Sequence, residues 1–153
     1  MPELVVDFIT SLDGYASAEG WPGWWGLEGP EYLAWLGEDP EGDYLVLMGA
    51  NTYRLMSRFA ADGEPGTEEL AGMSKLVFSN TLTGPLSWPN SRLIGGDAVA
   101  AVRQLKDDGA ESMRTLGSLT LCRSLLAAGL VDRFRLVVFP VITGSTGHDR
   151  IYD

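Results

Sequence analysis

The stretch GSLTLCRSLLAAGLVDRFRLVVFPVITGSTG, residues 117–147, joins two different periodicities in one segment. Residues 118–129 repeat apolar side chains at helical spacing and stop at Gly129, which predicts a helix. Residues 132–140 alternate over the outer half and are continuously apolar over the inner half, which predicts a strand. A helix that leads directly into a strand is the repeating unit of α/β proteins.

The rest of the chain repeats this alternation. Predicted strands cover residues 3–10, 43–49, 75–80, 91–95, 112–117 and 132–140, and predicted helices cover 30–39, 51–60, 96–109 and 118–129. Asn51 or Thr52 lies near the N-cap of the second helix, and Asp97 near that of the third. Residues 11–20, SLDGYASAEG, break the first strand with turn residues. The pattern predicts one α/β domain, residues 1–153, with a largely parallel sheet covered on both faces.

Composition and charge exclude several classes of function. The net charge is −10, and the first 53 residues carry ten acids and no Lys or Arg, so we expect no binding to nucleic acid or anionic lipid. No apolar run is long enough to span a membrane, and no signal peptide is recognisable. A single cysteine, Cys122, and a single histidine, His148, favour a reducing cytoplasm and argue against a metal site. We expect Cys122 to be buried and His148 to lie in an exposed turn.

Three predicted strands run directly into small or polar residues. The segments are MGANTY, FSNTL and LGSLTL, at residues 48–53, 78–82 and 116–121. In a parallel sheet these ends meet at one edge, where ligands bind, and a helix N-terminus there holds phosphate. Gly49 and Gly117 allow close approach of a ligand, and Thr52 and Ser118 could bind a diphosphate while capping their helices. Simple caps and turns remain the alternative, since neither GxGxxG nor a P-loop is present.

Four segments resemble the dihydrofolate reductase fold, in the branch that includes the reductase domain of the bifunctional riboflavin-biosynthesis protein. They are SLDGYASAEG, LMGANTYRLM, KLVFSNTL and the opening stretch with its GLVD, which is the most specific match. Together they span most of the chain. The resemblance implies a three-layer α/β sandwich with a mostly parallel central sheet and helices on both faces.

The resemblance also implies a nicotinamide cofactor, NADPH, across the carboxyl edge of the sheet. Its diphosphate would contact Thr52, Gly117, Ser118, Leu119 and Thr120. Its adenosine end would meet Gly49, Ala50, Asn51, Ser79 and Asn80, and its nicotinamide would sit against Ile9 and Ala16.

Two departures from the family pattern affect these expectations. Many relatives have an arginine after the Met-Gly pair that grips the 2′-phosphate of NADPH, and this chain has Ala50. Because losing a charge-assisted bond costs about 1.5–3 kcal/mol, NADH becomes an alternative cofactor. Relatives also continue beyond the position of Asp153 into a final strand, so the chain is either a short branch or truncated. A sheet edge exposed in this way would suit a homodimer.

The segment WPGWWG places Trp21, Trp24 and Trp25 on a Gly/Pro-rich loop after the first strand. In this fold that loop closes over the nicotinamide and substrate, so we expect the three tryptophans to form a lid that excludes water. Packing of these rings onto the core is the alternative.

The helix after this loop resembles the one that brings a carboxylic acid to the substrate in the reductases. Aligned on LAWL, the position of the acid holds Tyr32, with Glu31 one residue earlier, so folate reduction is not expected. Asp13, in the SLDG turn, is a candidate substrate contact or a turn residue. Water, Tyr53 or a carboxylate would supply the proton.

The leading hypothesis is an NAD(P)H-dependent reductase of a small aromatic or heterocyclic compound. A phosphorylated riboflavin precursor fits poorly if the pocket is built from the first 53 residues, which offer no base, unless Arg54, Arg58 or other later bases reach it. A flat, neutral heterocycle or a quinone-like ring suits aromatic walls better. The alternative is a non-catalytic nucleotide- or ligand-binding module that keeps the fold.

Overall fold

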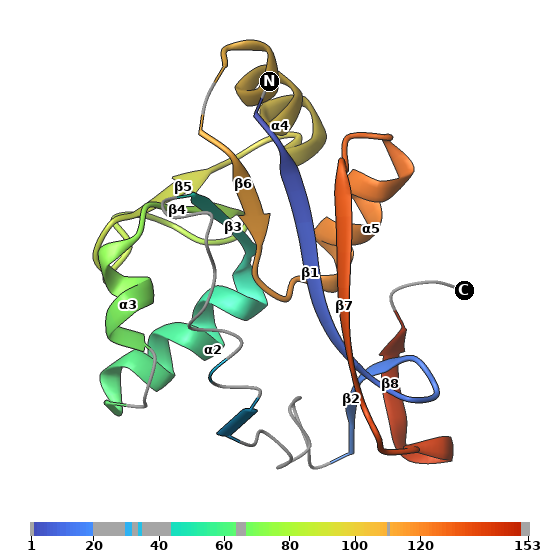
Figure 1. The fold of residues 1–153 in the computed structure, drawn as a ribbon. Coiled ribbons are helices and arrows are strands. Elements are labelled where there is room, and N and C mark those ends of the chain that lie inside the picture. The colour runs from blue at the N-terminus through green and yellow to red at the C-terminus, as the bar shows by residue number, and fades with distance from the viewer. Residues whose placement is uncertain are drawn as a thin grey trace.

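The central sheet of the protein contains six parallel strands in the order β5-β4-β3-β6-β1-β7 (Figure 1). The computed structural model describes residues 2–19, 30–31, 34, 44–63, 67–109 and 111–150. The strands are β1 Leu4–Ser11, β3 Leu45–Gly49, β4 Lys75–Phe78, β5 Ser91–Ile94, β6 Met113–Thr115 and β7 Arg133–Phe139. All six predicted strands are confirmed, each ending within two residues of its expected bounds.

Within the described ranges, two helices lie on each face of the sheet, in addition to the helical residues at 30–31 and 34. Helices α2 Ala50–Ala61 and α3 Thr67–Gly72 lie on one face, and α4 Ala98–Asp107 and α5 Leu119–Ala127 lie on the other (Figure 1). This arrangement confirms the predicted α/β fold, with a parallel central sheet and helices on both faces. Helix α3 was not predicted, because its six residues are too short for a recognisable apolar period. None of the helices in the described ranges is long and apolar enough to cross a membrane.

Alternating side chains of the strands fill two separate cores. Leu4, Leu47, Leu76 and Met113 pack with Val102 of α4 and Leu125 of α5, while Val46, Met48 and Val77 pack with Tyr53 and Met56 of α2. A parallel sheet covered on both faces requires apolar side chains on both sides of its strands, which explains their continuous apolar runs. Cys122 of α5 is fully buried, as expected.

A small second sheet corrects the expectation that residues 11–20 form only a turn. Strand β2, Tyr15–Ala18, pairs antiparallel with β8, Gly147–Arg150, just after a 3₁₀ turn at Gly144–Thr146. His148 is exposed, as expected, but lies on β8 and not in a turn. A Cβ at Gly147 would lie 2.5 Å from the Tyr15 ring, so only glycine fits there. The glycines that favour a turn in the sequence therefore serve close strand packing as well.

The strands have unequal lengths at their carboxyl ends. Strand β6 stops at Thr115, opposite Leu47 of β3, whereas β1 and β7 stay paired as far as Ser11 and Phe139. In Figure 1, β1 and β7 run past the end of β6 and past the start of α2. The ends of β3 and β6 therefore form a corner against the longer strands.

Candidate active site at the carboxyl edge

The hydroxyl of Ser118 joins the ends of β3 and β6. Its Oγ accepts a hydrogen bond of 2.8 Å from the backbone N–H of Gly49. The same oxygen lies 2.9 Å from Thr52 Oγ1 and 2.9 Å from the carbonyl oxygen of Leu116, to one of which it donates. Four of the predicted diphosphate and adenosine contacts, Gly49, Thr52, Gly117 and Ser118, are thus adjacent in the structure.

Two helices begin at this corner without a side-chain cap. Gly49 is the N-cap of α2 and Ser118 the N-cap of α5, and neither helix has a side-chain bond to its first-turn amides. The predicted capping by Asn51, Thr52 and Ser118 is therefore wrong, because α2 begins at Ala50 and the Ser118 hydroxyl is engaged elsewhere. Helix α4, by contrast, is capped as predicted by Asp97, which accepts from Val99 at 3.0 Å. The α2 and α5 amides remain suited to an anion.

The turn between β6 and α5 is held in an unusual backbone conformation. Gly117 has φ 52° and Ser118 has φ 65°, both in the left-handed region. A Cβ at Gly117 would lie 3.2 Å from Thr52 Oγ1. A side chain at position 117 would thus be strained by the backbone and crowded by α2, so the glycine keeps the turn close to Thr52.

Ser79 and Asn80, at the end of β4, shape the neighbouring turns. Ser79 Oγ accepts from the N–H groups of Thr81 and Leu82 at 3.1 and 3.0 Å. Asn80 Oδ1 accepts from the Gly96 N–H, just past β5, at 2.7 Å. The two side chains lie along the carboxyl edge of the sheet between β3 and β5. Both already accept hydrogen bonds from backbone amides.

The remaining predicted cofactor residues lie in the first turns of the two uncapped helices. Ala50 is half-buried, and Asn51 is exposed, its Oδ1 accepting from Arg54 Nη1 at 3.2 Å. Leu119 is half-buried and Thr120 is exposed. These four residues therefore lie at the carboxyl edge, as expected for their positions after the strands, and their contacts with a cofactor stay predictions.

Ile9 and Ala16, the predicted nicotinamide contacts, pack in different clusters. Ile9 packs against Phe139, while Ala16 packs against the cluster that contains Phe8 and Cys122. The sequence analysis missed Thr10, which follows Ile9 but faces the other side of β1: it is fully buried, and its Oγ1 has no hydrogen-bond partner in the described structure. A threonine in an apolar strand is an ordinary strand former, so no sequence signal marks it.

Asp13 ties together the turns that follow β1 and β7. Its carboxylate accepts from Ser11 Oγ at 2.6 Å, from Gly144 N at 2.9 Å and from Thr143 N at 3.2 Å. The Ser11 bond, helped by the two backbone amides, holds the pKa of Asp13 well below its ordinary value. Asp13 is thus an ionised link between turns, which favours the turn role over the direct substrate contact.

We expect Asp13→Asn to destabilise the protein at neutral pH and to matter less in acid. The folded protein holds Asp13 at a lower pKa than the unfolded chain, so its stabilisation is present above the unfolded value of about 3.9 and is lost as pH falls toward the folded value. Urea midpoints of wild type and variant, measured from pH 7 to pH 3, should differ by a constant amount near neutrality and by progressively less below about pH 4. The exposed Glu111→Gln is the control; a difference independent of pH would contradict the role of the charge.

The other predicted catalytic residues are not brought to this corner. Tyr53 is buried beside Trp88, and its hydroxyl accepts from the backbone amides of Ser87 and Trp88 at 3.1 and 3.4 Å, an anchoring role. Glu31 is exposed on a helical segment. Tyr32 and the proposed lid residues Trp21, Trp24 and Trp25 lie outside the described residues.

Three arginines from the second half of the chain share a sheet face with β1. Arg114 and Arg133 lie opposite Val5 on its two sides, and Arg135 lies opposite Asp7. Their side chains are on the face where α2 packs against β3. Arg135 holds Asp7 through two bonds, Nε to Oδ1 at 2.5 Å and Nη2 to Oδ2 at 2.9 Å, and Arg133 lies 3.2 Å from Glu3. The premise that the substrate region beside β1 lacks basic residues therefore does not hold. The charge argument against a phosphorylated substrate rests on that premise and fails with it.

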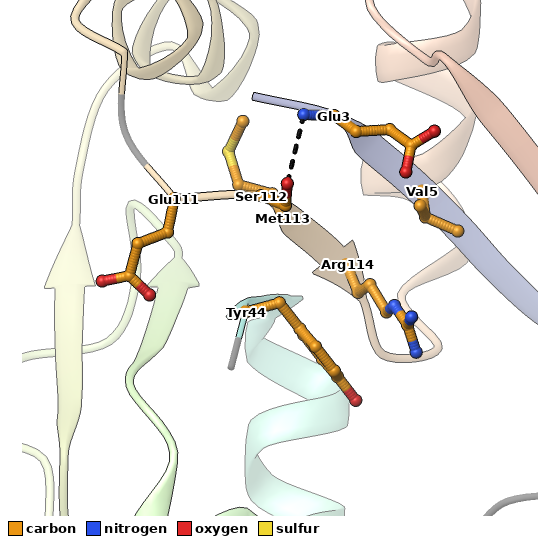
Figure 2. A pocket seen from close by; sticks show the side chains of 7 residues that line it. All are labelled: Glu3, Val5, Tyr44, Glu111, Ser112, Met113 and Arg114. Atoms are coloured by element: carbon orange, nitrogen blue, oxygen red, sulfur yellow. Dashed lines mark hydrogen bonds between the residues drawn. The ribbon is translucent and has the colours of Figure 1, made fainter. Parts of the chain in front are cut away.

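A hollow of about 410 Å³ lies at the opposite, amino end of the same strands. Figure 2 shows Tyr44 and Arg114 side by side on its floor, with Glu3 and Glu111 at its two sides. The Arg114 guanidinium lies 4.2 Å from the centre of the Tyr44 ring, and Arg114 is almost fully buried. The hollow is lined by the first two residues of β6, Met113 and Arg114, whereas the uncapped helices begin beyond the carboxyl ends of the strands.

Comparisons with known proteins agree with this architecture. The family model described as RibD C-terminal domain matches residues 2–153. A protein from Shewanella sp. PV-4 described as a riboflavin biosynthesis protein is similar in structure, with TM-score 0.71, 22% identity and coverage of 97% of this chain and 82% of that one. A pyrimidine reductase-like protein from Corynebacterium diphtheriae gives TM-score 0.56 and 17% identity, over 95% of this chain and 77% of the other.

A third similar structure is a longer, two-activity protein. It is the diaminohydroxyphosphoribosylaminopyrimidine deaminase/5-amino-6-(5-phosphoribosylamino)uracil reductase of Thermotoga maritima, with TM-score 0.68 and 15% identity, covering 98% of this chain and 48% of that one. At these identities the likeness shows the fold alone. A comparison with curated protein sequences gives no match.

Proposed function

The chain belongs to the RibD C-terminal domain family, and on that premise we propose that it is a reductase that binds NADPH or NADH and reduces a small planar heterocycle. The dinucleotide would lie across the carboxyl edge, with its diphosphate between the first turns of α2 and α5. The substrate would lie in the adjoining corner, against β1.

The observation that carries this proposal is the pair of uncapped helix N-termini joined by Ser118. Each N-terminus offers unpaired amide donors and the positive end of a helix dipole, equivalent to about half a unit charge. The bond from Gly49 to Ser118 brings the two starts together. Two helix N-termini that lie next to each other are better suited to bind two linked phosphates than to bind a single anion.

Two further features of the corner fit a dinucleotide. Gly117 leaves room where a Cβ would crowd Thr52, so a ligand could approach the backbone closely. The Thr10 hydroxyl is buried without a partner in the described structure, and strand alternation places it on the Phe8 face of β1, against which Ala16, one of the two predicted nicotinamide contacts, packs. An unsatisfied buried hydroxyl costs about 1–3 kcal/mol. A small local rearrangement that let the Thr10 hydroxyl bond to the carboxamide of a nicotinamide would recover part of that cost.

A bound reduced nicotinamide would supply the hydride. The chain would hold the cofactor and substrate in position and exclude water from them. Thr52, Ser118 and Thr120 would hold the diphosphate, while Ala50, Asn51 and Asn80 would face the adenosine end. Tyr53 and Asp13 are both engaged in structural bonds, so we propose that water delivers the proton. Ala50 offers no charge to a 2′-phosphate, so we propose that NADH is accepted as well as NADPH.

Titration of the protein with NADPH and NADH, followed by quenching of the tryptophan fluorescence, tests the proposal. We expect saturable quenching by both dinucleotides and weak or no response to adenosine, which lacks the diphosphate. Absence of binding by either dinucleotide would contradict the reductase assignment. Saturable binding without oxidation of the cofactor by any amino- or oxopyrimidine tried would favour the alternative, a binding module that retains the fold.

A further inference from the structure

The ion pair between Asp7 of β1 and Arg135 of β7 lies close to the corner where the substrate is expected. The N–H of Asp7 donates to Thr115 Oγ1 at 3.2 Å, and Gly117 follows two residues later, about 7 Å along an extended chain. Asp7 is two residues before Ile9, so both side chains lie on the same face of β1. The carboxylate thus stands beside the predicted nicotinamide wall, at the inner end of the corner.

The Asp7 carboxylate is held in place and is still accessible. Arg135 binds both of its oxygens, and the side chains of Asp7 and Arg135 are 30% and 29% exposed. A carboxylate offers about four acceptor positions, and Arg135 occupies two of them. A carboxylate that is held by an arginine and faces a corner is suited to bind an N–H donor of a ligand.

Among the described helices, α2 and α3 cover this face over β3 and β4 and not over β1 and β7 (Figure 1). The neighbouring Glu3–Arg133 pair lies at the amino end of the same face, with Glu3 four residues before Asp7 and just outside β1. Among the described residues, this face carries two similar ion pairs, and the Asp7–Arg135 pair is the one next to the strand ends.

We propose that Asp7, oriented by Arg135, is the substrate-recognition residue of this site and accepts a hydrogen bond from a ring N–H or amino group of the heterocycle. This assignment rests on the proposed function and narrows the substrate class. Rings with N–H donors on one edge are favoured, whereas quinone-like rings present only acceptors to the carboxylate and are disfavoured by lone-pair repulsion and desolvation.

The test uses 5,6-diaminouracil, which carries ring and amino N–H groups, and 1,3-dimethyluracil, which carries none. Calorimetric titrations are made on the protein saturated with NADP⁺. Wild type should bind diaminouracil at least about tenfold more tightly than dimethyluracil, and Asp7→Asn should weaken diaminouracil binding by about tenfold or more, the size of a lost charge-assisted bond. The response of Asp7→Asn to dimethyluracil should not change.

Glu3→Gln is the matched control, since it removes an acid from a similar arginine pair on the same face, just before β1 begins and at the far end from the corner. It should leave both ligand affinities unchanged, and Asp7→Glu should restore part of the diaminouracil affinity lost in Asp7→Asn. Thermal unfolding and NADPH titration of each variant verify that the fold and the cofactor site are intact. If Asp7→Asn does not fold, the comparison of the two ligands on wild type still decides.

Equal binding of the two ligands by wild type, equal diaminouracil affinity of wild type and Asp7→Asn, or an equal loss in Glu3→Gln would each overturn the assignment of Asp7. Those outcomes leave NADPH binding intact and so contradict only this inference. Failure of wild type to bind NADPH or NADH would instead contradict the proposed function.

Discussion

Replacing Lys75 by methionine is expected to lower the free energy of unfolding by about 3 kcal/mol, because buried carbonyl groups would lose their only charged partner. Lys75 is 1% exposed, and its Nζ donates to the carbonyl oxygens of Leu70 and Met73 at 2.5 and 2.8 Å, with Ala71 at 3.3 Å. The ammonium thus satisfies the C-terminal end of α3, where the helix dipole favours a cation. It also lies 4.5 Å from the centre of the Trp88 ring.

Methionine keeps the length and the apolar stem of the side chain, so the loss measures the ammonium contacts and not a cavity. Burial lowers the pKa of Lys75 to about 8, so urea unfolding at pH 7 compares the protonated form. Lys106→Met is the control: Lys106 also donates to a carbonyl, that of Leu130 at 2.8 Å, but its pair with the half-exposed Asp132 can be replaced by water. Equal losses of unfolding free energy in Lys75→Met and Lys106→Met would show that burial of the accepting carbonyl groups does not determine the size of the loss.

Introducing a carboxylate at position 120 should weaken NADPH binding by at least about tenfold, or about 1.4 kcal/mol, while leaving the fold intact. Thr120 is exposed in the first turn of α5, beside the amides that we assign to the diphosphate. An acid in that turn interacts well with the helix dipole and should stabilise α5 by about 0.3–1 kcal/mol. The same charge repels a bound diphosphate, so in Thr120→Asp stability and affinity should change in opposite directions.

Ser124→Asp provides the matched control, because Ser124 is exposed on the same helix one turn later and bonds to the Thr120 carbonyl. It adds the same charge away from the helix N-terminus. Fluorescence titrations should show a much smaller loss of NADPH affinity in Ser124→Asp than in Thr120→Asp. If both variants bind NADPH as wild type does, the diphosphate does not lie at the start of α5.

The sequence was most informative where one local pattern decides the structure. The apolar runs of all six sheet strands and the Asp97 cap of α4 are local signals, and they are confirmed. The placement of Gly49, Thr52, Gly117 and Ser118 at one edge follows from the strand ends of a parallel sheet, and it also holds.

Features that depend on distant partners were not predictable in this way. The β2–β8 pair joins residues about 130 positions apart, and nothing in the segment SLDGYASAEG marks its partner. The left-handed conformation of Ser118 arises from bonds to Gly49, Thr52 and Leu116 and not from a serine preference. The capping prediction failed for the same reason, since the hydroxyl was assigned to its own helix.

Charge counted along the sequence was misleading at the sheet face. The absence of bases from the first 53 residues is correct, yet Arg114, Arg133 and Arg135 reach β1 from neighbouring strands. A sheet face collects residues from strands that are far apart in the chain, so its charge depends on strand order. That order is a tertiary property, which the local patterns leave open.

The position of β1 has a consequence for how the protein folds during synthesis. This strand is made first, but its neighbours in the sheet, β6 and β7, begin at residues 113 and 133. A nascent chain released only as far as α4 would leave β1 with both of its edges unsatisfied, and pairing over such separations is slow. We therefore expect folding to wait until the last strand has left the ribosome, and β1 to be the segment most in need of chaperone protection until then.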